Sequence, residues 1–115
     1  MTDPRERKAE TEALFRELNE RIAETAERFD AERVELHCEC ADPACHERVE
    51  APLAEYEDVR AQATDFLVVP GHEAPEIERV VGRRRRYAVV RKVDGLVARI
   101  VRRLDPRGPR PSPSA

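Results

Sequence analysis

The residues best suited to chemistry in this chain are its three cysteines, which lie within eight positions as Cys38, Cys40 and Cys45. In a strand, side chains two positions apart leave the same face, so Cys38 and Cys40 can direct both sulfurs to one point. Asp42-Pro43 favours a turn that returns Cys45 to that point. Three thiolates then lie one ligand short of the tetrahedral set that zinc prefers.

A histidine is expected to complete the set. His72 is preferred because it lies in the loop Pro70-Gly71-His72-Glu73, which is free to deliver a ring nitrogen. His46 and His37 each adjoin a cysteine, and neighbouring side chains diverge in an extended chain. These two histidines, or water, remain alternatives for the fourth position. The predicted cofactor is a structural Zn²⁺, with Glu73 or Glu47 orienting the imidazole ring, and its predicted ligands are Cys38, Cys40, Cys45 and His72.

Other interpretations of the cysteine run are weaker. Free cysteines are often simply buried, but a turn flanked by acidic residues is a poor place for burial. A thiol redox role lacks the Cys-x-x-Cys spacing. A zinc-dependent hydrolytic enzyme would need an open metal position and a general base, for which Glu39, Glu47 and Glu73 are candidates. Three thiolates blunt the Lewis acidity of zinc, and the chain has no H-E-x-x-H, P-loop or G-x-S-x-G motif, so catalysis is not expected.

Around this site, the sequence predicts one small domain with a thin core. The chain has 115 residues, of which 40% are hydrophobic and only 4% aromatic. No stretch is long and apolar enough for a membrane span, and the first residues contain no apolar signal segment. A cytoplasmic location is therefore expected, and membrane binding is not. In a reducing cytosol an odd number of cysteines favours metal binding over disulfides.

Residues 1–30 are expected to form a long amphipathic helix. Asp3 is placed to cap the helix and Pro4 occupies its first position. The apolar residues follow helical spacing and are expected to dock on the protein's own sheet, with a homodimer through this helix as the alternative. These stripe residues are Leu14, Phe15, Leu18, Ile22, Ala26 and Phe29.

Residues 31–104 are expected to form a zinc-stapled α+β domain of about four short strands and further helices. Strands are predicted at 33–40, 48–51, 65–69 and 86–91, from alternating or compact apolar runs. Helices are predicted at 53–61, 75–81 and 96–104. Residues 105–115, rich in proline, arginine and serine, are expected to be a disordered tail.

Three segments together resemble a family of short uncharacterised bacterial proteins from high-GC genomes. They are the cysteine run at 38–45, the segment 53–60, and the segment 66–73 with its Pro-Gly-His-Glu loop. The resemblance covers roughly residues 33–92 and implies no activity. The nineteen arginines, against two lysines, fit a high-GC genome.

The charge distribution suggests a second kind of partner. Residues 1–58 carry 18 acidic and 8 basic side chains, whereas residues 59–115 carry 6 acidic and 13 basic ones. Self-complementation of the two halves is the simplest interpretation. The alternative is nucleic-acid binding, in which Arg83, Arg84, Arg85 and Arg86 contact phosphates and Tyr87 stacks on a base.

The sequence thus favours a small zinc-binding module, regulatory or interacting with an unknown protein, over a nucleic-acid-binding protein or an enzyme.

Overall fold

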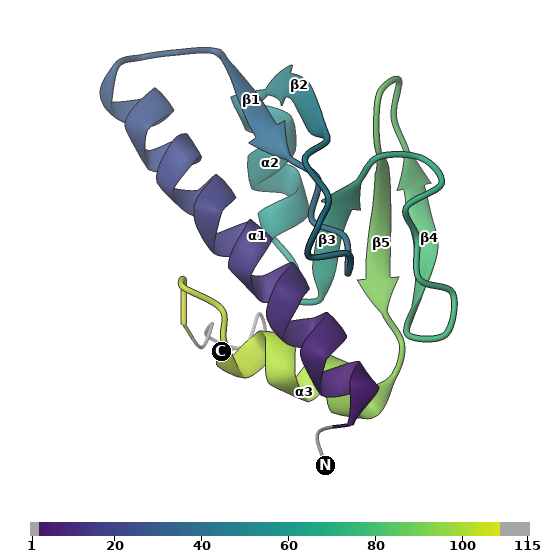
Figure 1. Cartoon of the computed structure of the whole chain (residues 1–115). Coiled ribbons are helices and arrows are strands. Elements are labelled where there is room, and N and C mark those ends of the chain that lie inside the picture. Colours follow the sequence, from purple (N-terminus) through teal and green to yellow (C-terminus); the bar gives the residue numbers. More distant parts are fainter. Residues whose placement is uncertain (1–2, 109–115) are drawn as a thin grey trace, which may run out of the picture.

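The computed structural model describes residues 3–108, and in this range it contains three helices and five strands (Figure 1). The strands form two antiparallel sheets, a β1-β2 hairpin and a three-stranded sheet of order β3-β5-β4. The α+β class expected from the sequence is confirmed, and within 3–108 no helix combines the length and hydropathy that a membrane span needs. The elements in chain order are α1 (Pro4–Arg28), β1 (Arg33–His37), β2 (Arg48–Pro52), α2 (Leu53–Arg60), β3 (Asp65–Val68), β4 (Glu78–Arg83), β5 (Ala88–Lys92) and α3 (Gly95–Arg103).

Both α1 and α3 begin directly after an aspartate that caps the helix. The Asp3 carboxylate accepts a hydrogen bond of 2.9 Å from the Arg5 amide, and Pro4 opens α1 as predicted. The Asp94 carboxylate does the same for α3, accepting from the amides of Leu96 and Val97. Each cap satisfies amides that have no partner inside the helix. The two helices pack against each other, and α1 also packs on β1.

The predicted apolar stripe of α1 faces the interior only in part: Ala26 is buried and Ile22 packs against a core cluster, but the other members named next are exposed, and for them the prediction is wrong. Leu14, Leu18 and Phe29 are 64%, 43% and 75% exposed. The buried face is instead made of alanines and polar residues, because small side chains allow close approach and the polar ones find partners on facing elements. These buried residues are Ala9, Glu12, Ala13, Arg16, Asn19, Glu20, Ala23 and Ala26.

A row of buried ionisable groups therefore runs along the inner face of α1. Near its start, Glu12 accepts a hydrogen bond of 2.6 Å from Lys92 in β5, and Lys92 also pairs with Glu78 in β4. The Lys92 ammonium and the Arg16 guanidinium each lie 4.4 Å from the centre of the Phe66 ring. Cations over an aromatic face are attracted by its quadrupole, so Phe66 helps both charges to remain buried.

Farther along α1, Arg60 at the end of α2 is fully buried and pairs with Glu20 at 2.8 Å and with Asp105. Arg107 binds Glu20 and Glu57. Asp105 and Arg107, which the sequence analysis placed in the tail, are thus held by the folded unit. Residues 109–115 of that predicted tail lie outside the described residues.

The helix predicted at 75–81 is wrong. Amides of Ile77 and Glu78 both bond to the Ala74 carbonyl, which gives one turn, and β4 then begins at Glu78. Pairing with β5 places Val80 opposite Val90. Ladder hydrogen bonds and the buried Glu78–Lys92 pair outweigh the local signals of Pro75 and the acidic residues, since propensity is a weak prior.

Two apolar clusters fill the interior. One gathers residues of α2 and the β1-β2 hairpin, including Leu36, Val49 and Tyr56. The other joins β3, β5 and α3, and all three cysteines belong to it. The cysteine segment thus leaves one sheet and packs into the core of the other.

Candidate metal centre

The cysteines lie on the connection between β1 and β2, which turns where the sequence predicts. The Cys38 amide bonds to the Glu47 carbonyl at 2.9 Å and extends the hairpin beyond its last ladder pair. The Cys45 amide then bonds to the Asp42 carbonyl at 3.1 Å, across Pro43. The Asp42 side chain also accepts a hydrogen bond from the Ala44 amide. This turn brings Cys45 back beside the other two cysteines.

His72 is delivered by a tight turn after β3. Its amide bonds to the Val69 carbonyl at 2.9 Å, with Pro70 and Gly71 at the two central positions. Gly71 has a φ of +96°, which only glycine adopts without strain, and proline followed by such a glycine is typical of a type II turn. Glu73 bonds to the Gly71 amide and so braces the loop. The turn fixes the point from which the imidazole projects.

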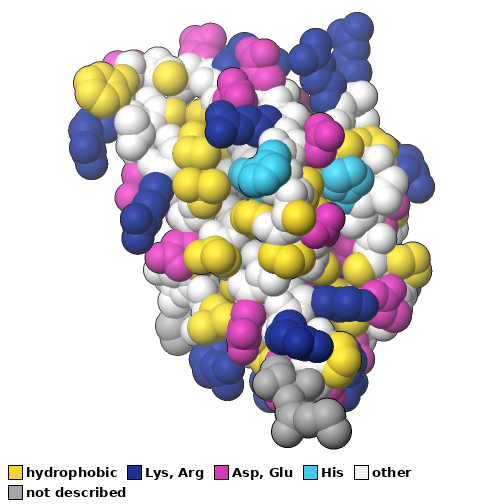
Figure 2. Space-filling view, in the orientation of Figure 1, with side chains coloured by type: hydrophobic (Ala, Val, Ile, Leu, Met, Phe, Trp, Pro, Cys, Tyr) yellow, Lys and Arg dark blue, Asp and Glu magenta, His cyan; other side chains and the backbone are white. Residues whose placement is uncertain are grey.

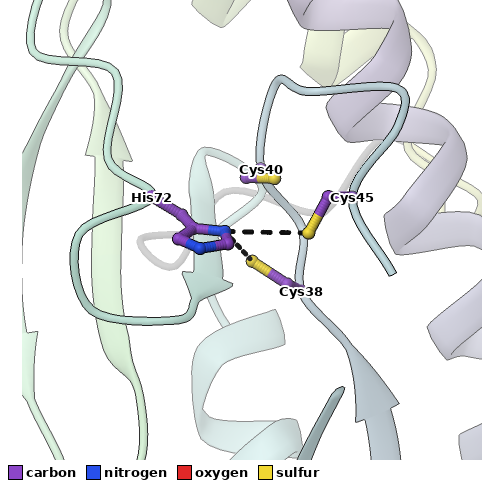
Figure 3. A group of neighbouring side chains, drawn as sticks. All are labelled: Cys38, Cys40, Cys45 and His72. Atoms are coloured by element: carbon purple, nitrogen blue, oxygen red, sulfur yellow. Dashed lines mark hydrogen bonds between the residues drawn. The ribbon is translucent and has the colours of Figure 1, made fainter. Parts of the chain in front are cut away.

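The structure brings the predicted ligands together (Figure 3). The nearest ligand atoms of Cys38, Cys40, Cys45 and His72 all lie within 4.8 Å of one another, so the group can hold a metal ion. His72 Nδ1 lies 3.6 Å from Cys38 Sγ and 3.7 Å from Cys45 Sγ. Bond lengths of about 2.3 Å to sulfur and 2.05 Å to nitrogen give a tetrahedral S···N edge of about 3.6 Å. One ring nitrogen at this distance from two sulfurs fits a shared tetrahedral centre.

The environment of the sulfurs disfavours the thiolate form when no cation is bound. All three cysteines are free thiols, and their residues are 0%, 2% and 7% exposed in chain order. Burial raises the pKa of both Cys38 and Cys40, and neighbouring sulfurs add to the effect at Cys38. Buried thiolates this close repel one another, so a divalent cation at their centre is what would stabilise them.

The Cys38 sulfur has a further partner that holds it in place. The Val69 amide donates a hydrogen bond of 3.2 Å to Cys38 Sγ. Hydrogen bonds of this kind orient a metal ligand and favour its charged form. Val69 directly follows β3, so the bond joins the cysteine segment to the second sheet.

The other two histidines lie outside this cluster. His46 is exposed. His37 is buried and stacks on Phe15, with ring centres 4.1 Å apart. Its Nδ1 lies 2.6 Å from the Cys38 carbonyl oxygen and its Nε2 lies 3.0 Å from the Cys45 carbonyl oxygen. The His37 ring therefore ties the two ends of the cysteine segment together.

Glu39 anchors the same segment from the opposite side. Its carboxylate accepts hydrogen bonds of 2.8 Å from the Asn19 amide nitrogen and 3.0 Å from the Leu67 amide. Its own amide donates to the Leu67 carbonyl at 2.9 Å. The Asn19 side chain also donates a hydrogen bond to the His37 carbonyl and accepts one from the His37 amide. The alternation that places two cysteines on one face thus places Glu39 on the other, against α1 and β3.

Sequence reasoning missed these anchoring roles of Asn19, His37 and Glu39. The alternation of the run 38–40 was the only available signal, because it requires Glu39 to face away from the sulfurs. Two of the glutamates named as candidate general bases already accept hydrogen bonds: Glu39 from the Asn19 side chain and the Leu67 amide, and Glu73 from the Gly71 amide. Glu47 is exposed. The arginines at 83–86 lie at the turn between β4 and β5 and take no part in this cluster.

Comparisons with protein-family models, curated proteins and solved structures found no match to this chain. The family resemblance drawn from the sequence stays a prediction, and the functional argument depends on the geometry of the site.

Proposed function

We propose that this chain is a small zinc-binding module of the interaction or regulatory class, with a structural Cys3His site. The observation that carries the proposal is the position of His72 Nδ1, 3.6 and 3.7 Å from two cysteine sulfurs. Thiolate and imidazole in a tetrahedral arrangement are the ligands that zinc prefers. Unpaired thiols also fit a reducing cytoplasm, which is the proposed setting.

A structural role is favoured over catalysis because the chain supplies four ligands. Catalytic zinc sites keep a position for water, whereas a complete set of four protein ligands closes the coordination sphere. Two of the three candidate general bases are also committed to backbone or side-chain hydrogen bonds. The proposed function is therefore not catalytic.

In this proposal, the metal ion would hold the two sheets together. Cys38, Cys40 and Cys45 come from the β1-β2 connection, whereas His72 comes from the loop between β3 and β4. A bound ion would bridge the two sheets at the point where Glu39 already pairs with Leu67. Structural zinc contributes roughly 10 kcal/mol or more of apparent binding energy, which is comparable to the whole stability of a small domain.

Metal content and unfolding of matched variants test the proposal. Untagged wild type is expected to purify with one zinc per chain, and Cys38→Ser, Cys45→Ser and His72→Ala should each lower the zinc content and the melting temperature. His46→Ala is the control, because this exposed histidine neighbours a ligand without facing the sulfurs. Wild type without metal, or a His72→Ala variant with unchanged zinc affinity, would overturn the Cys3His assignment.

A further inference from the structure

The turn between β4 and β5 carries four consecutive arginines, Arg83 to Arg86, and all four are exposed. Figure 1 shows this turn extending beyond the body of the three-stranded sheet, and Figure 2 shows Lys and Arg side chains projecting in the same region at the upper right. The turn therefore presents a dense positive charge to solvent.

These four arginines follow one another without interruption, and the charge of Arg86 helps to lower the pKa of Glu50 without forming an ion pair with it. Arg60 and Arg107 are neutralised by buried or half-buried acids, and Arg91 is held by Asp65 at 2.7 Å. Within residues 3–108, no ion pair involves any of the four turn arginines. Self-complementation of the charged halves therefore leaves this cluster available.

The turn is also fixed in place. The Arg84 amide bonds to the Tyr87 carbonyl at 2.8 Å, which closes the turn. Tyr87 is 3% exposed and its hydroxyl donates a hydrogen bond of 2.6 Å to Glu55 in α2. The expectation that Tyr87 stacks on a nucleic-acid base is therefore wrong, because the ring is buried in the core of the hairpin sheet.

We propose that this arginine turn binds the phosphate backbone of duplex nucleic acid without reading its sequence. Guanidinium groups match phosphate geometry with paired donors, so a run of arginines at an exposed turn can contact successive phosphates from outside the grooves. Single-strand recognition depends on aromatic stacking, which the burial of Tyr87 removes. A lipid surface is disfavoured because none of the four residues at the tip is apolar.

The proposal gives a definite salt dependence. Neutralising up to four phosphates gives a slope of log K against log salt of about −3.6 for a B-form duplex. Binding should therefore weaken about 150-fold between 50 and 200 mM salt. DNA and RNA duplexes should both bind, because phosphates rather than base edges are contacted.

Fluorescence anisotropy with labelled 20-bp DNA and RNA duplexes tests the proposal on the zinc-loaded chain. The variant Arg83→Gln/Arg84→Gln/Arg85→Gln/Arg86→Gln should lose at least 30-fold in duplex affinity at 50 mM salt and most of the salt slope. The matched control Arg28→Gln/Arg99→Gln/Arg102→Gln/Arg103→Gln removes the same charge from exposed helix positions and should lose less than 5-fold. Melting curves of both variants show whether the fold is kept.

Three outcomes would overturn the proposal. The first is the absence of duplex binding by wild type at 50 mM salt. The second is an equal loss in the two variants, which would show an effect of net charge alone. The third is tighter binding to single strands of the same length, or to vesicles of phosphatidylserine and phosphatidylcholine, than to the duplexes.

Discussion

Replacing Glu12 with glutamine should change how the stability of the protein depends on pH. Glu12 is fully buried and shares Lys92 with a second buried carboxylate, Glu78. Burial raises the pKa of Glu12 to about 8; the Lys92 charge opposes this shift and Glu78 adds to it. In the unfolded chain the pKa returns to about 4.5. The single Lys92 ammonium thus compensates two buried carboxylates.

Proton linkage sets the direction in which the stability of the protein changes with pH. Between pH 4.5 and 8 the folded protein keeps the Glu12 proton that the unfolded chain has lost. Stability contributed by this group is therefore complete below about pH 4.5 and falls as the pH rises towards 8. At about 1.4 kcal/mol per pH unit, the full loss is up to about 5 kcal/mol, and sharing of the proton with Glu78 reduces the part assigned to Glu12.

Glutamine at position 12 keeps the shape and an oxygen that accepts from Lys92, but it cannot ionise. Glu12→Gln should match wild type near pH 5 and exceed its unfolding free energy by about 2 to 5 kcal/mol near pH 8.5. Urea denaturation at fixed ionic strength and saturating zinc measures this difference at each pH. Glu10→Gln, which removes an exposed carboxylate from the same helix, should show a flat difference. A difference independent of pH for Glu12→Gln, or a less stable variant at high pH, would refute the reasoning.

Three further outcomes are expected. Asn19→Ala removes one of the two hydrogen bonds to the buried Glu39 carboxylate and both bonds to the His37 backbone, so it should cost about 3 kcal/mol in urea unfolding and weaken zinc binding in a competition titration. Arg60→Met, which removes the buried cation shared by Glu20 and Asp105 while Glu20 keeps Arg107, should cost about 3 kcal/mol. Self-association through α1 should shift sedimentation at high concentration and be abolished by Leu18→Glu, because an antiparallel pair of helices would join the exposed leucines and oppose their flanking arginines and glutamates. An unchanged midpoint in either stability test, or a sedimentation coefficient independent of concentration, would count against these expectations.

Features set by neighbouring residues were predictable from the sequence. Asp42-Pro43 and Pro70-Gly71 form turns through their own backbone preferences, so the clustering of the cysteines and the presentation of His72 on a loop were predictable, whereas the meeting of the two segments depends on the bonds of Glu39 to Leu67 and of Val69 to Cys38. The cap of α1 by Asp3 is local in the same sense.

Features decided by distant partners were not predictable in this way. The inner face of α1 is polar because Lys92, Arg60 and Glu39 supply matching groups from far along the chain. The segment that begins at Glu78 is a strand because β5 is available to pair with it. Hydrophobic periodicity depends only on the spacing of apolar residues. It therefore does not indicate a buried face whose charged groups are paired with groups on other elements.

Zinc K-edge X-ray absorption of the purified, metal-loaded chain measures the coordination sphere directly. Three sulfur atoms at about 2.3 Å and one nitrogen at about 2.0 to 2.1 Å are the predicted shell, and His72→Ala should replace or remove the nitrogen while all three sulfurs remain. A shell of only nitrogen and oxygen, or a nitrogen contribution unchanged in His72→Ala, would contradict a centre that joins the two sheets through Cys38, Cys40, Cys45 and His72.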